Sequence, residues 1–397
     1  MPPKKNDTNK LDALLASVTE DMLGNDLPQQ FADNGIRVER LLLEMVRPDP
    51  VQARRVLPER IHFKFHEDRL TPTQALRELV QLAQVSARQQ GRPFANVLEL
   101  LPNSDSDTEE PEKLSPEEDT LRDLVNLAVT IRDDGQVNPV TVVDVSQGVT
   151  RLYRIETGER RYWAAWLLRD FFPEYESNGM IDCIVVPAEN SSVFRQAKEN
   201  TARKGLTAIA MARQAALLLL TVHGHEIPLH AVNNDFYRQA LELDLRGKRE
   251  YTEVILSAMG GISRTQLSRY KSLLNLTDEA LTLADRHDIP EGKLRHVISF
   301  SSQDHVEVIR QIVDFNLTVK QVKQLSNQDD DKQVSEDIQH KQSRKLVKIF
   351  RDFAKTSPEN LALSLLDQEG DIHSARAQLQ RMRDLLSEME IHLNQNS

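Results

Sequence analysis

Apolar residues recur three and four positions apart over most of the chain. In residues 71–90, a capping signal at Thr71-Pro72-Thr73-Gln74 precedes the apolar positions and Gly91 follows them. A second stretch stops at Asp134-Gly135, and its apolar positions are Leu121, Leu124, Val125, Ala128 and Ile131. After Gly205 almost every signal is helical. The pattern therefore predicts a protein that is mostly α overall.

Three short runs of apolar and β-branched residues interrupt the helices in the first half of the chain. They cover residues 136–143, 152–155 and 181–186. A helical pattern follows each of the last two runs, and the second of these helices is expected at about 190–203. The apolar face of the first consists of Trp163, Ala164, Leu167, Leu168 and Phe171. Strands that alternate with helices predict a compact α+β unit ending near residue 205.

Length and composition narrow the class of protein. A chain of 397 residues exceeds one ordinary core, so two or three domains are expected. No apolar run approaches the roughly 18 residues of a membrane span, and the N-terminus lacks a secretory signal, which indicates a cytoplasmic protein with no membrane partner. The single cysteine, Cys183, lies in an apolar run and is expected to be a buried, inert thiol.

The net charge of −11 is unevenly distributed. Residues 104–119 hold eight acids and one lysine without an apolar period, so we expect a disordered acidic loop there. Residues 246–274 are basic by contrast, with six basic and two acidic side chains. A basic island in an acidic chain is typical of a protein that binds nucleic acid through one region.

The two ends of the chain differ from its middle. Residues 1–35 are polar and predict a flexible arm, and residues 327–343 predict a charged linker. Residues 344–397 carry three heptads of apolar a and d positions, which predict a coiled coil with a second copy, one helix packed on the segment around Phe350, or both. The heptad positions are Ile372, Ala375, Leu379, Met382, Leu386, Met389 and Leu393.

A turn from strand to helix at Gly158 is the first candidate for chemistry. The free N–H groups of a helix N-terminus stabilise an anion, and Arg160-Arg161 would oppose the helix dipole unless an anion compensated them. The alternative is an ordinary surface network in which Glu159 and nearby acids pair with the arginines. Downstream, Glu199-Asn200 offers oxygen ligands for Mg²⁺, or is simply a solvated helix end.

Two short helices near residue 260 are the second candidate for a functional site. Gly260-Gly261 ends the first helix, and Ser263 with Gln266 forms a capping box for the second. This pattern matches a helix-turn-helix, although a helical hairpin with a solvated face has the same pattern. The candidate DNA contacts are Ser263, Arg264, Thr265, Gln266, Ser268, Arg269 and Lys271. Among them Arg264, Gln266 and Arg269 suit base edges, whereas Ser263 and Lys271 suit phosphates.

The segment before these helices, residues 223–248, is predicted to be a linker. It contains His223, His225 and His230, which invite comparison with a metal cluster. Pro228 breaks any helix that would align the three side chains, and no carboxylate partner is identifiable. A metal site is therefore not expected here.

Four blocks, taken in their order, resemble the ParB family of chromosome and plasmid partition proteins. Pro50-Val-Gln-Ala-Arg54 resembles the family's N-P-x-Q-P-R segment, and Gly135-Gln-Val-Asn-Pro-Val-Thr-Val-Val143 resembles its G-q-l-x-P-i-x-V strand. Gly158-Glu-Arg-Arg-Tyr-Trp-Ala-Ala165 is similar to the G-E-R-R-x-R-A-A box. Glu199-Asn-Thr-Ala-Arg-Lys-Gly-Leu206 is similar to the E-N-x-x-R-x-x-L block. The match covers about residues 36–57 and 120–325, and residues 58–118 are then an insertion.

The resemblance implies a nucleotide-binding, ParB- and sulfiredoxin-like α+β domain at 36–205. An all-α helix-turn-helix domain at 206–326 and a C-terminal helical dimerisation module at 344–397 would follow it. The implied ligand is cytidine triphosphate (CTP) with Mg²⁺. The residues implied in nucleotide binding are Gln136, Asn138, Gly158, Glu159, Arg160, Arg161, Asn200 and Arg203. Glu199 would be catalytic, and Glu199 and Asn200 would serve the metal.

Two positions depart from the family pattern. Trp163 stands where a third arginine is usual, and Ala202 stands where glutamine is frequent, so nucleotide affinity or hydrolysis is expected to be altered or lost. The turn at Gly158 also lacks the cysteine that sulfiredoxin chemistry requires, which disfavours that reaction.

The function implied is a CTP-gated, dimeric clamp on a centromere-like DNA site, associated with the nucleoid or a plasmid and working with a ParA-type ATPase. The one enzymatic activity implied is a CTPase, which converts CTP to CDP and phosphate, and not a metabolic reaction. The alternative is a ParB-like transcriptional regulator of a plasmid, phage or mobile element without nucleotide turnover, which Trp163 and the acidic stretch favour. A nuclease or an ADP-dependent kinase on the same scaffold is a third reading, but no carboxylate cluster for it is apparent.

Overall fold

The computed structural model describes residues 38–101, 114–188, 191–202, 205–246 and 249–328, and isolated positions beyond them. By its contacts the chain divides into two compact units, Met1–Ser326 and Asn327–Ser397. The predicted arm lies outside the described residues, as does the predicted linker from residue 329 on. Most of the predicted C-terminal module lies outside them as well, although Ile372 and Leu379 are described as helical and exposed.

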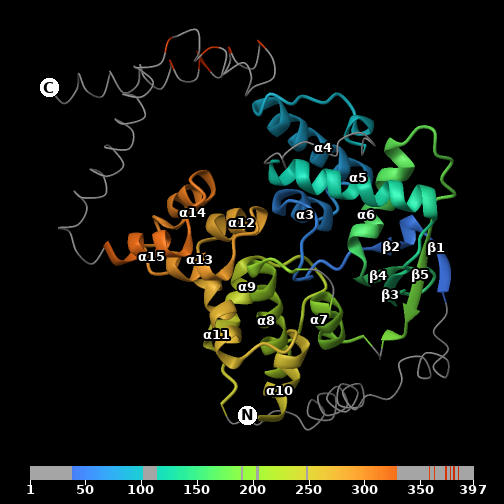
Figure 1. Ribbon diagram of the computed structural model, residues 1–397. Coiled ribbons are helices and arrows are strands. Elements are labelled where there is room, and N and C mark those ends of the chain that lie inside the picture. The colour runs from blue at the N-terminus through green and yellow to red at the C-terminus, as the bar shows by residue number, and fades with distance from the viewer. Residues whose placement is uncertain are drawn as a thin grey trace. The chain divides into compact units, whose positions relative to one another are not determined.

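A five-stranded sheet occupies one end of the first unit (Figure 1). Its strands are β1 Val38–Leu42, β2 Val46–Arg47, β3 Val140–Asp144, β4 Tyr153–Thr157 and β5 Met180–Val186. In the order β1-β5-β3-β4-β2, the pairs β1/β5 and β3/β4 are antiparallel, and β3/β5 and β2/β4 are parallel. The three predicted strands are confirmed. The first begins only after Pro139, which has no N–H group for a ladder.

Helices pack on this sheet to form a mixed core. They are α3 Glu59–His66, α4 Pro72–Gln89, α5 Pro116–Asp134 and α6 Glu159–Phe171. The predicted capping box is present at Thr71 and Gln74, and α5 ends at Gly135, whose φ of 77° is left-handed. The residues predicted as an insertion, 58–118, supply α3 and α4, and the buried Leu76 and Phe65 place these helices in the same core as Trp163.

The prediction of a disordered acidic loop at 104–119 is wrong for its last part, because Pro116 begins α5. The Ser115 side chain caps this helix and accepts a hydrogen bond from the Glu118 N–H at 3.2 Å. The buried Glu118 carboxylate accepts from Arg92 at 3.1 Å and from Arg122 at 2.9 Å. Acids in a first turn favour the helix dipole, so these residues build a helix rather than a loop. Residues 102–113 are outside the described part of the chain.

A second, all-helical core follows in the chain. Its helices are α7 Val193–Ala202, α8 Ala208–Val222, α9 Asn234–Arg238, α10 Arg249–Ala258, α11 Arg264–Ser272, α12 Asp278–Arg286, α13 Glu291–Val297, α14 His305–Asp314 and α15 Val319–Gln328. Short 3-10 turns occur at η1 Leu43–Met45, η2 Val97–Leu100, η4 Gln239–Glu242 and η5 Leu273–Asn275. Almost every side chain of α8 is buried, and helices of this second core surround it (Figure 1). Val51 and Ala53, from the segment after β2, also belong to this core.

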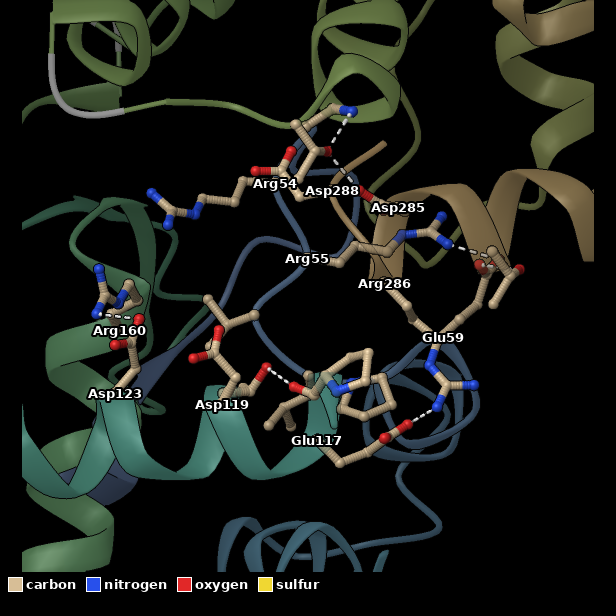
Figure 2. Close-up of a pocket in the computed structure, with 18 of the residues that line it drawn as sticks. Arg54, Arg55, Glu59, Glu117, Asp119, Asp123, Arg160, Asp285, Arg286 and Asp288 are labelled. Atoms are coloured by element: carbon tan, nitrogen blue, oxygen red, sulfur yellow. Dashed lines mark hydrogen bonds and ion pairs between the residues drawn. The ribbon is translucent and has the colours of Figure 1, made fainter. Parts of the chain in front are cut away.

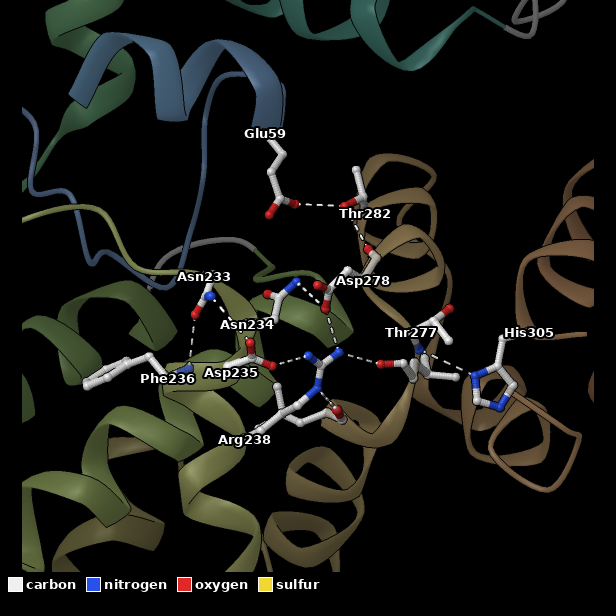
Figure 3. A network of polar contacts seen from close by, with 12 residues as sticks. Glu59, Asn233, Asn234, Asp235, Phe236, Arg238, Thr277, Asp278, Thr282 and His305 are labelled. Atoms are coloured by element: carbon white, nitrogen blue, oxygen red, sulfur yellow. Dashed lines mark hydrogen bonds and ion pairs between the residues drawn. The ribbon is translucent and has the colours of Figure 1, made fainter. Parts of the chain in front are cut away.

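The prediction of a linker at 223–248 is wrong, since this segment contains α9 and η4. Tyr237 and Ala240 are fully buried in the second core. Arg238 donates to Asp235 at 2.8 Å and to Asp278 of α12 at 2.5 Å, within the polar network of Figure 3. The apolar and ionic contacts of two short helical turns therefore fix a segment whose sequence shows no helical period. Among the described helices none is both long and apolar enough to span a membrane.

Candidate functional site

The turn at Gly158 lies between β4 and α6, as the sequence predicts. Gly158 has a φ of 98° and is the N-cap residue of α6. A Cβ atom on Gly158 would lie 3.3 Å from the Cα of Val140 and 3.3 Å from Nη1 of Arg161. Glycine is therefore required both by the backbone angle and by the close approach of β3. The free amides of the α6 N-terminus and the Arg161 guanidinium meet at this turn, which makes it suited to an anion.

Polar contacts hold three segments of the chain together beside this turn. Gln196 of α7 donates to the carbonyl oxygen of Glu156 at 3.1 Å, and Gln52 of the first block donates to the same oxygen at 3.4 Å. Gln196 also donates to Asp49 at 3.4 Å. The Glu156 carboxylate pairs with Arg195 of α7. The segment after β2, the end of β4 and α7 are thus held to one another by polar contacts beside the turn.

A cavity of about 560 Å³ opens next to this arrangement (Figure 2). Its lining includes Arg54 of the first block, Arg160 of the turn, and Gly205 and Thr207, which follow α7. Burial lowers the pKa of Arg54, and the nearby Arg160 guanidinium lowers it further. Figure 2 shows both side chains extending toward the same side of the cavity. Two guanidinium groups this close favour an anion between them.

Acidic side chains also line the cavity, and two of them pair with its arginines. Asp123 of α5 accepts from Arg160 at 3.0 Å, and Glu117 pairs with Arg286 of α12. Burial raises the pKa of Asp119, and the neighbouring Asp123 carboxylate raises it further. The alternative of an ion-paired surface network is therefore realised for Arg160, but its partner is on α5 and is not Glu159.

Glu159 and Trp163 form a buried pair. The Trp163 indole, only 1% exposed, donates from Nε1 to the Glu159 carboxylate at 2.9 Å. Its ring lies edge-on to Phe65 of α3, with ring centroids 5.0 Å apart. Burial raises the pKa of Glu159 to about 7, and the Trp163 hydrogen bond partly opposes that rise. Trp163, which stands where the family pattern has a third arginine, therefore belongs to the core and supports the Gly158 turn from within it. Its side chain does not line the cavity.

Several predicted nucleotide residues lie elsewhere. Gln136 bonds to β5, donating to the Asp182 carbonyl oxygen at 2.7 Å and accepting from the Asp182 N–H at 3.0 Å. Asn138 is exposed, and neither it nor Gln136 lines the cavity. Arg203 lies outside the described residues.

The residues predicted to serve a metal are on α7. The Glu199 carboxylate is near enough to Glu156 to raise the pKa of that carboxyl, although burial is the larger cause. Neither Glu199 nor Asn200 is part of the cavity lining. In the described part of the chain, no three His, Cys, Asp or Glu side chains are grouped as metal ligands.

The helix-turn-helix geometry agrees with the sequence. Helix α10, the turn through Gly260 and Gly261, and α11 follow one another, and the buried Leu267 belongs to the same core as α8. The Ser263 hydroxyl accepts from the Gln266 N–H at 3.2 Å, and Gln266 Oε1 accepts from the Ser263 N–H at 2.9 Å. The exposed side chains of α11 and its cap are Ser263, Arg264, Thr265, Gln266, Ser268 and Arg269.

Lys271 differs from these candidates. Its ammonium group donates to the carbonyl oxygens of Leu241 at 3.1 Å and Leu243 at 2.8 Å. Burial lowers its pKa. Lys271 therefore links α11 to the 3-10 turn η4. A phosphate bound by Lys271 would have to share its ammonium group with these two carbonyl oxygens.

Replacing Ser263 with alanine should lower the free energy of unfolding by about 1 kcal/mol, because the first turn of α11 loses its cap. Urea denaturation measures this loss. Thr71→Ala, which removes the equivalent capping box of α4, should cost a similar amount. If Ser263→Ala left the free energy of unfolding unchanged while Thr71→Ala lowered it, the Ser263 cap would not stabilise α11 as described.

The sequence did not predict which side chains lie near Arg54 and Arg160 in the cavity. Arg54 was visible in the first block, but nothing in its local pattern placed it beside Arg160. Asp119 falls at the end of the predicted acidic loop and Asp123 in the predicted helix that follows, and both line the cavity. The i,i+4 spacing of these two acids on a helix was the one signal that could have linked them.

Comparison with known proteins gives matches in sequence. The family described as the ParB HTH domain matches residues 242–331. A probable chromosome-partitioning protein ParB of Vibrio cholerae serotype O1 is 26% identical over 235 residues, which are 58% of this chain and 66% of the relative. The matched part is thus slightly less than two thirds of that relative's length.

Two solved structures of the C-terminally truncated chromosome-partitioning protein ParB from Caulobacter crescentus are also similar. The complex with the centromeric parS site is 19% identical, with a TM-score of 0.29, and the match covers 59% of this chain and 98% of that one. The complex with CTP-gamma-S is 17% identical, with a TM-score of 0.21, and the match covers 70% and 99%. The family match covers the helix-turn-helix. By these sequence matches the chain carries a ParB HTH domain and is similar to ParB partition proteins.

Proposed function

We propose that this protein is a DNA-binding partition protein of the ParB type, which reads a centromere-like site in double-stranded DNA through α11. The observation that carries this proposal is the helix-turn-helix with an exposed polar and basic face, within the range matched by the family domain. Arg264, Gln266 and Arg269 are proposed to contact base edges, because their side chains match major-groove patterns. Ser263, Thr265 and Ser268 are proposed to contact the DNA backbone.

We further propose that the cavity beside Gly158 binds CTP. A volume of about 560 Å³ falls in the usual range for small-molecule sites. Arg54 and Arg160 line the cavity and suit a triphosphate. Arg161 and the amides of the α6 N-terminus suit phosphates as well and lie at the Gly158 turn, but they are not part of the lining. Asp119 and Asp123 fit it less well, since they place negative charge in the same cavity.

The metal ion, the second copy of the chain and the protein partner proposed here follow from the resemblance to the ParB family. By that resemblance Glu199 and Asn200 would hold Mg²⁺ through oxygen atoms. Neither side chain lines the cavity, so the described structure does not bring this pair to the proposed triphosphate site. Residues 36–205 and 206–326 are proposed as the nucleotide and DNA modules, and residues 344–397 as the surface that pairs two copies. A ParA-type ATPase is the proposed protein partner on the nucleoid or a plasmid.

A regulator that binds DNA without nucleotide turnover is the second candidate. The ion pair between Arg160 and Asp123 favours it, because an arginine that already has a carboxylate partner has less to gain from a phosphate. Trp163 does not favour it, since its side chain is buried beneath the turn.

Two substitutions should separate the proposed modules. Arg160→Ala should weaken CTP binding more than about tenfold and leave site-specific DNA binding intact, because it removes one phosphate partner. Arg269→Ala should weaken DNA binding by about tenfold and leave CTP binding intact. Equilibrium binding of labelled CTP and of a DNA duplex measures both effects.

A matched control is available on α5. Arg132, like Arg160, has a side chain that is 38% exposed and paired with an aspartate, here Asp133, but it does not line the cavity. Arg132→Ala should change neither affinity. If Arg160→Ala and Arg269→Ala each removed both activities, the assignment of two separate modules would be wrong.

A further inference from the structure

The first two turns of α5 present three carboxylates to the cavity. Asp119 and Asp123 are four residues apart and therefore lie on one face of the helix, and Glu117 joins them in the cavity lining. Each end of this set is paired with an arginine. Asp123 holds Arg160 of the Gly158 turn at 3.0 Å, and Glu117 pairs with Arg286 of α12. Figure 2 shows these two ion pairs at separate places along the cavity wall.

The charges around the cavity explain why this matters for an anion. The basic residues of the lining are Arg54, Arg55, Arg160 and Arg286, and the acidic ones are Glu59, Glu117, Asp119, Asp123, Asp285 and Asp288. The acidic residues of the lining outnumber the arginines. A triphosphate that entered this cavity without any change in the ion pairs would therefore meet net repulsion. Burial and the Asp123 carboxylate both raise the pKa of Asp119, which indicates that the acids already repel one another. Two of the α5 carboxylates, Asp123 and Glu117, pair with arginines that line the cavity themselves.

We propose that the acidic face of α5, formed by Glu117, Asp119 and Asp123, is an internal mimic of the phosphates and gates the nucleotide cavity. The inference rests on the proposed binding of CTP. An incoming triphosphate takes over Arg160 from Asp123, and the same negative charge weakens the hold of Glu117 on Arg286. Because Arg286 belongs to α12 in the second core, nucleotide entry loosens a link between α5 and the DNA-binding helices.

A gate of this kind predicts the sign of a mutational effect. Removing the carboxylate charge frees Arg160 and removes repulsion, so affinity for the triphosphate rises. If Asp119 and Asp123 were instead ligands of a cation that accompanies the nucleotide, the same substitutions would lower affinity. The ion pair of Asp123 with Arg160 favours the gate, because the carboxylate already has a cationic partner of the protein's own.

The test compares the full-length protein with Asp123→Asn and with the double variant Asp119→Asn, Asp123→Asn. Titration calorimetry with CTP, and separately with inorganic triphosphate, is done at a fixed Mg²⁺ concentration. Asp123 is 58% exposed, so its substitution should leave the fold intact and tighten binding only about threefold. The double variant should bind about tenfold more tightly, and this gain should shrink at about 0.5 M salt.

Asp133→Asn is the control, because Asp133 is also an α5 aspartate paired with an arginine but lies outside the cavity. The affinity of the Asp133→Asn variant for CTP and for inorganic triphosphate should equal that of the parent. If the parent binds CTP and the variants bind it equally or more weakly, the gate is overturned and the proposed function stands. Binding by the variants alone supports the gate in its strongest form. Absence of binding by parent and variants alike, with DNA binding retained, overturns the CTP proposal and the gate with it.

Discussion

Replacing Arg213 with methionine should lower the free energy of unfolding by about 3 kcal/mol. Arg213 lies on α8, its side chain is 0% exposed, and its Nη1 atom donates to Asp285 at 2.5 Å. Its Nη2 atom lies 3.8 Å from Glu59 of α3. Methionine would leave Asp285 without its buried cation, whereas Glu59 keeps its ion pair with Arg55 at 2.6 Å. A broken buried pair typically costs about 3–5 kcal/mol. We expect the lower end, because Asp285 and Glu59 are 19% and 18% exposed.

Urea denaturation of the parent and the variant measures this loss. Arg40→Met is the control, since Arg40 is 69% exposed and its pair with Asp182 should be worth less than about 1 kcal/mol. Equal losses in the two variants would show that the Arg213 charge is not held as the structure describes. The effect matters for function because Arg213 joins the helix α3 of the first core to the helices of the second.

Replacing Glu159 with glutamine should remove a pH dependence of stability. Burial raises the pKa of Glu159 in the folded state from an ordinary 4.5 to about 7. The folded state therefore binds this proton more tightly than the unfolded state, and the free energy of unfolding falls as pH rises from about 4.5 to above 7. The full cost above the folded pKa is about 3 kcal/mol. Glutamine keeps an oxygen acceptor for the Trp163 indole but has no charge to bury.

The expected result is that Glu159→Gln and the parent are equally stable at about pH 4.5, and that the variant is more stable at about pH 8. Denaturant unfolding at a series of pH values measures the difference. Glu39→Gln, a change at an exposed position of β1, should leave the parent's pH profile unchanged. A parent profile that is flat between these pH values, or one that Glu159→Gln does not alter, would contradict the buried carboxylate.

The sequence predicted those features that depend on short-range chemistry. The capping boxes at Thr71 and Ser263 specify where α4 and α11 begin, because each joins a side chain to a backbone group three residues away. The turn at Gly158 was predicted from the change of period around it, and its φ of 98° gives the physical reason for glycine. Strand and helix order around this turn was therefore accessible without a structure.

What the sequence did not predict depends on contacts between distant segments. The direction of Trp163 could not be read from its position in a motif, because the pocket that receives its ring is built by Phe65 of α3. Asp123 and Arg160 are thirty-seven residues apart, and no local pattern indicates that they pair. The sequence predicts a phosphate contact for Lys271, whereas two backbone carbonyl oxygens of the segment predicted to be a linker bind its ammonium group.

The central claim is that one chain combines a nucleotide pocket at Gly158 with a DNA reader at α11. The most direct measurement is the binding and turnover of CTP by the full-length protein, compared with ATP, GTP and UTP, with and without DNA from its own replicon. The account predicts binding that prefers CTP and that one DNA site stimulates. Specific DNA binding with no affinity for any nucleotide would contradict it and would leave the regulator as the function of this chain.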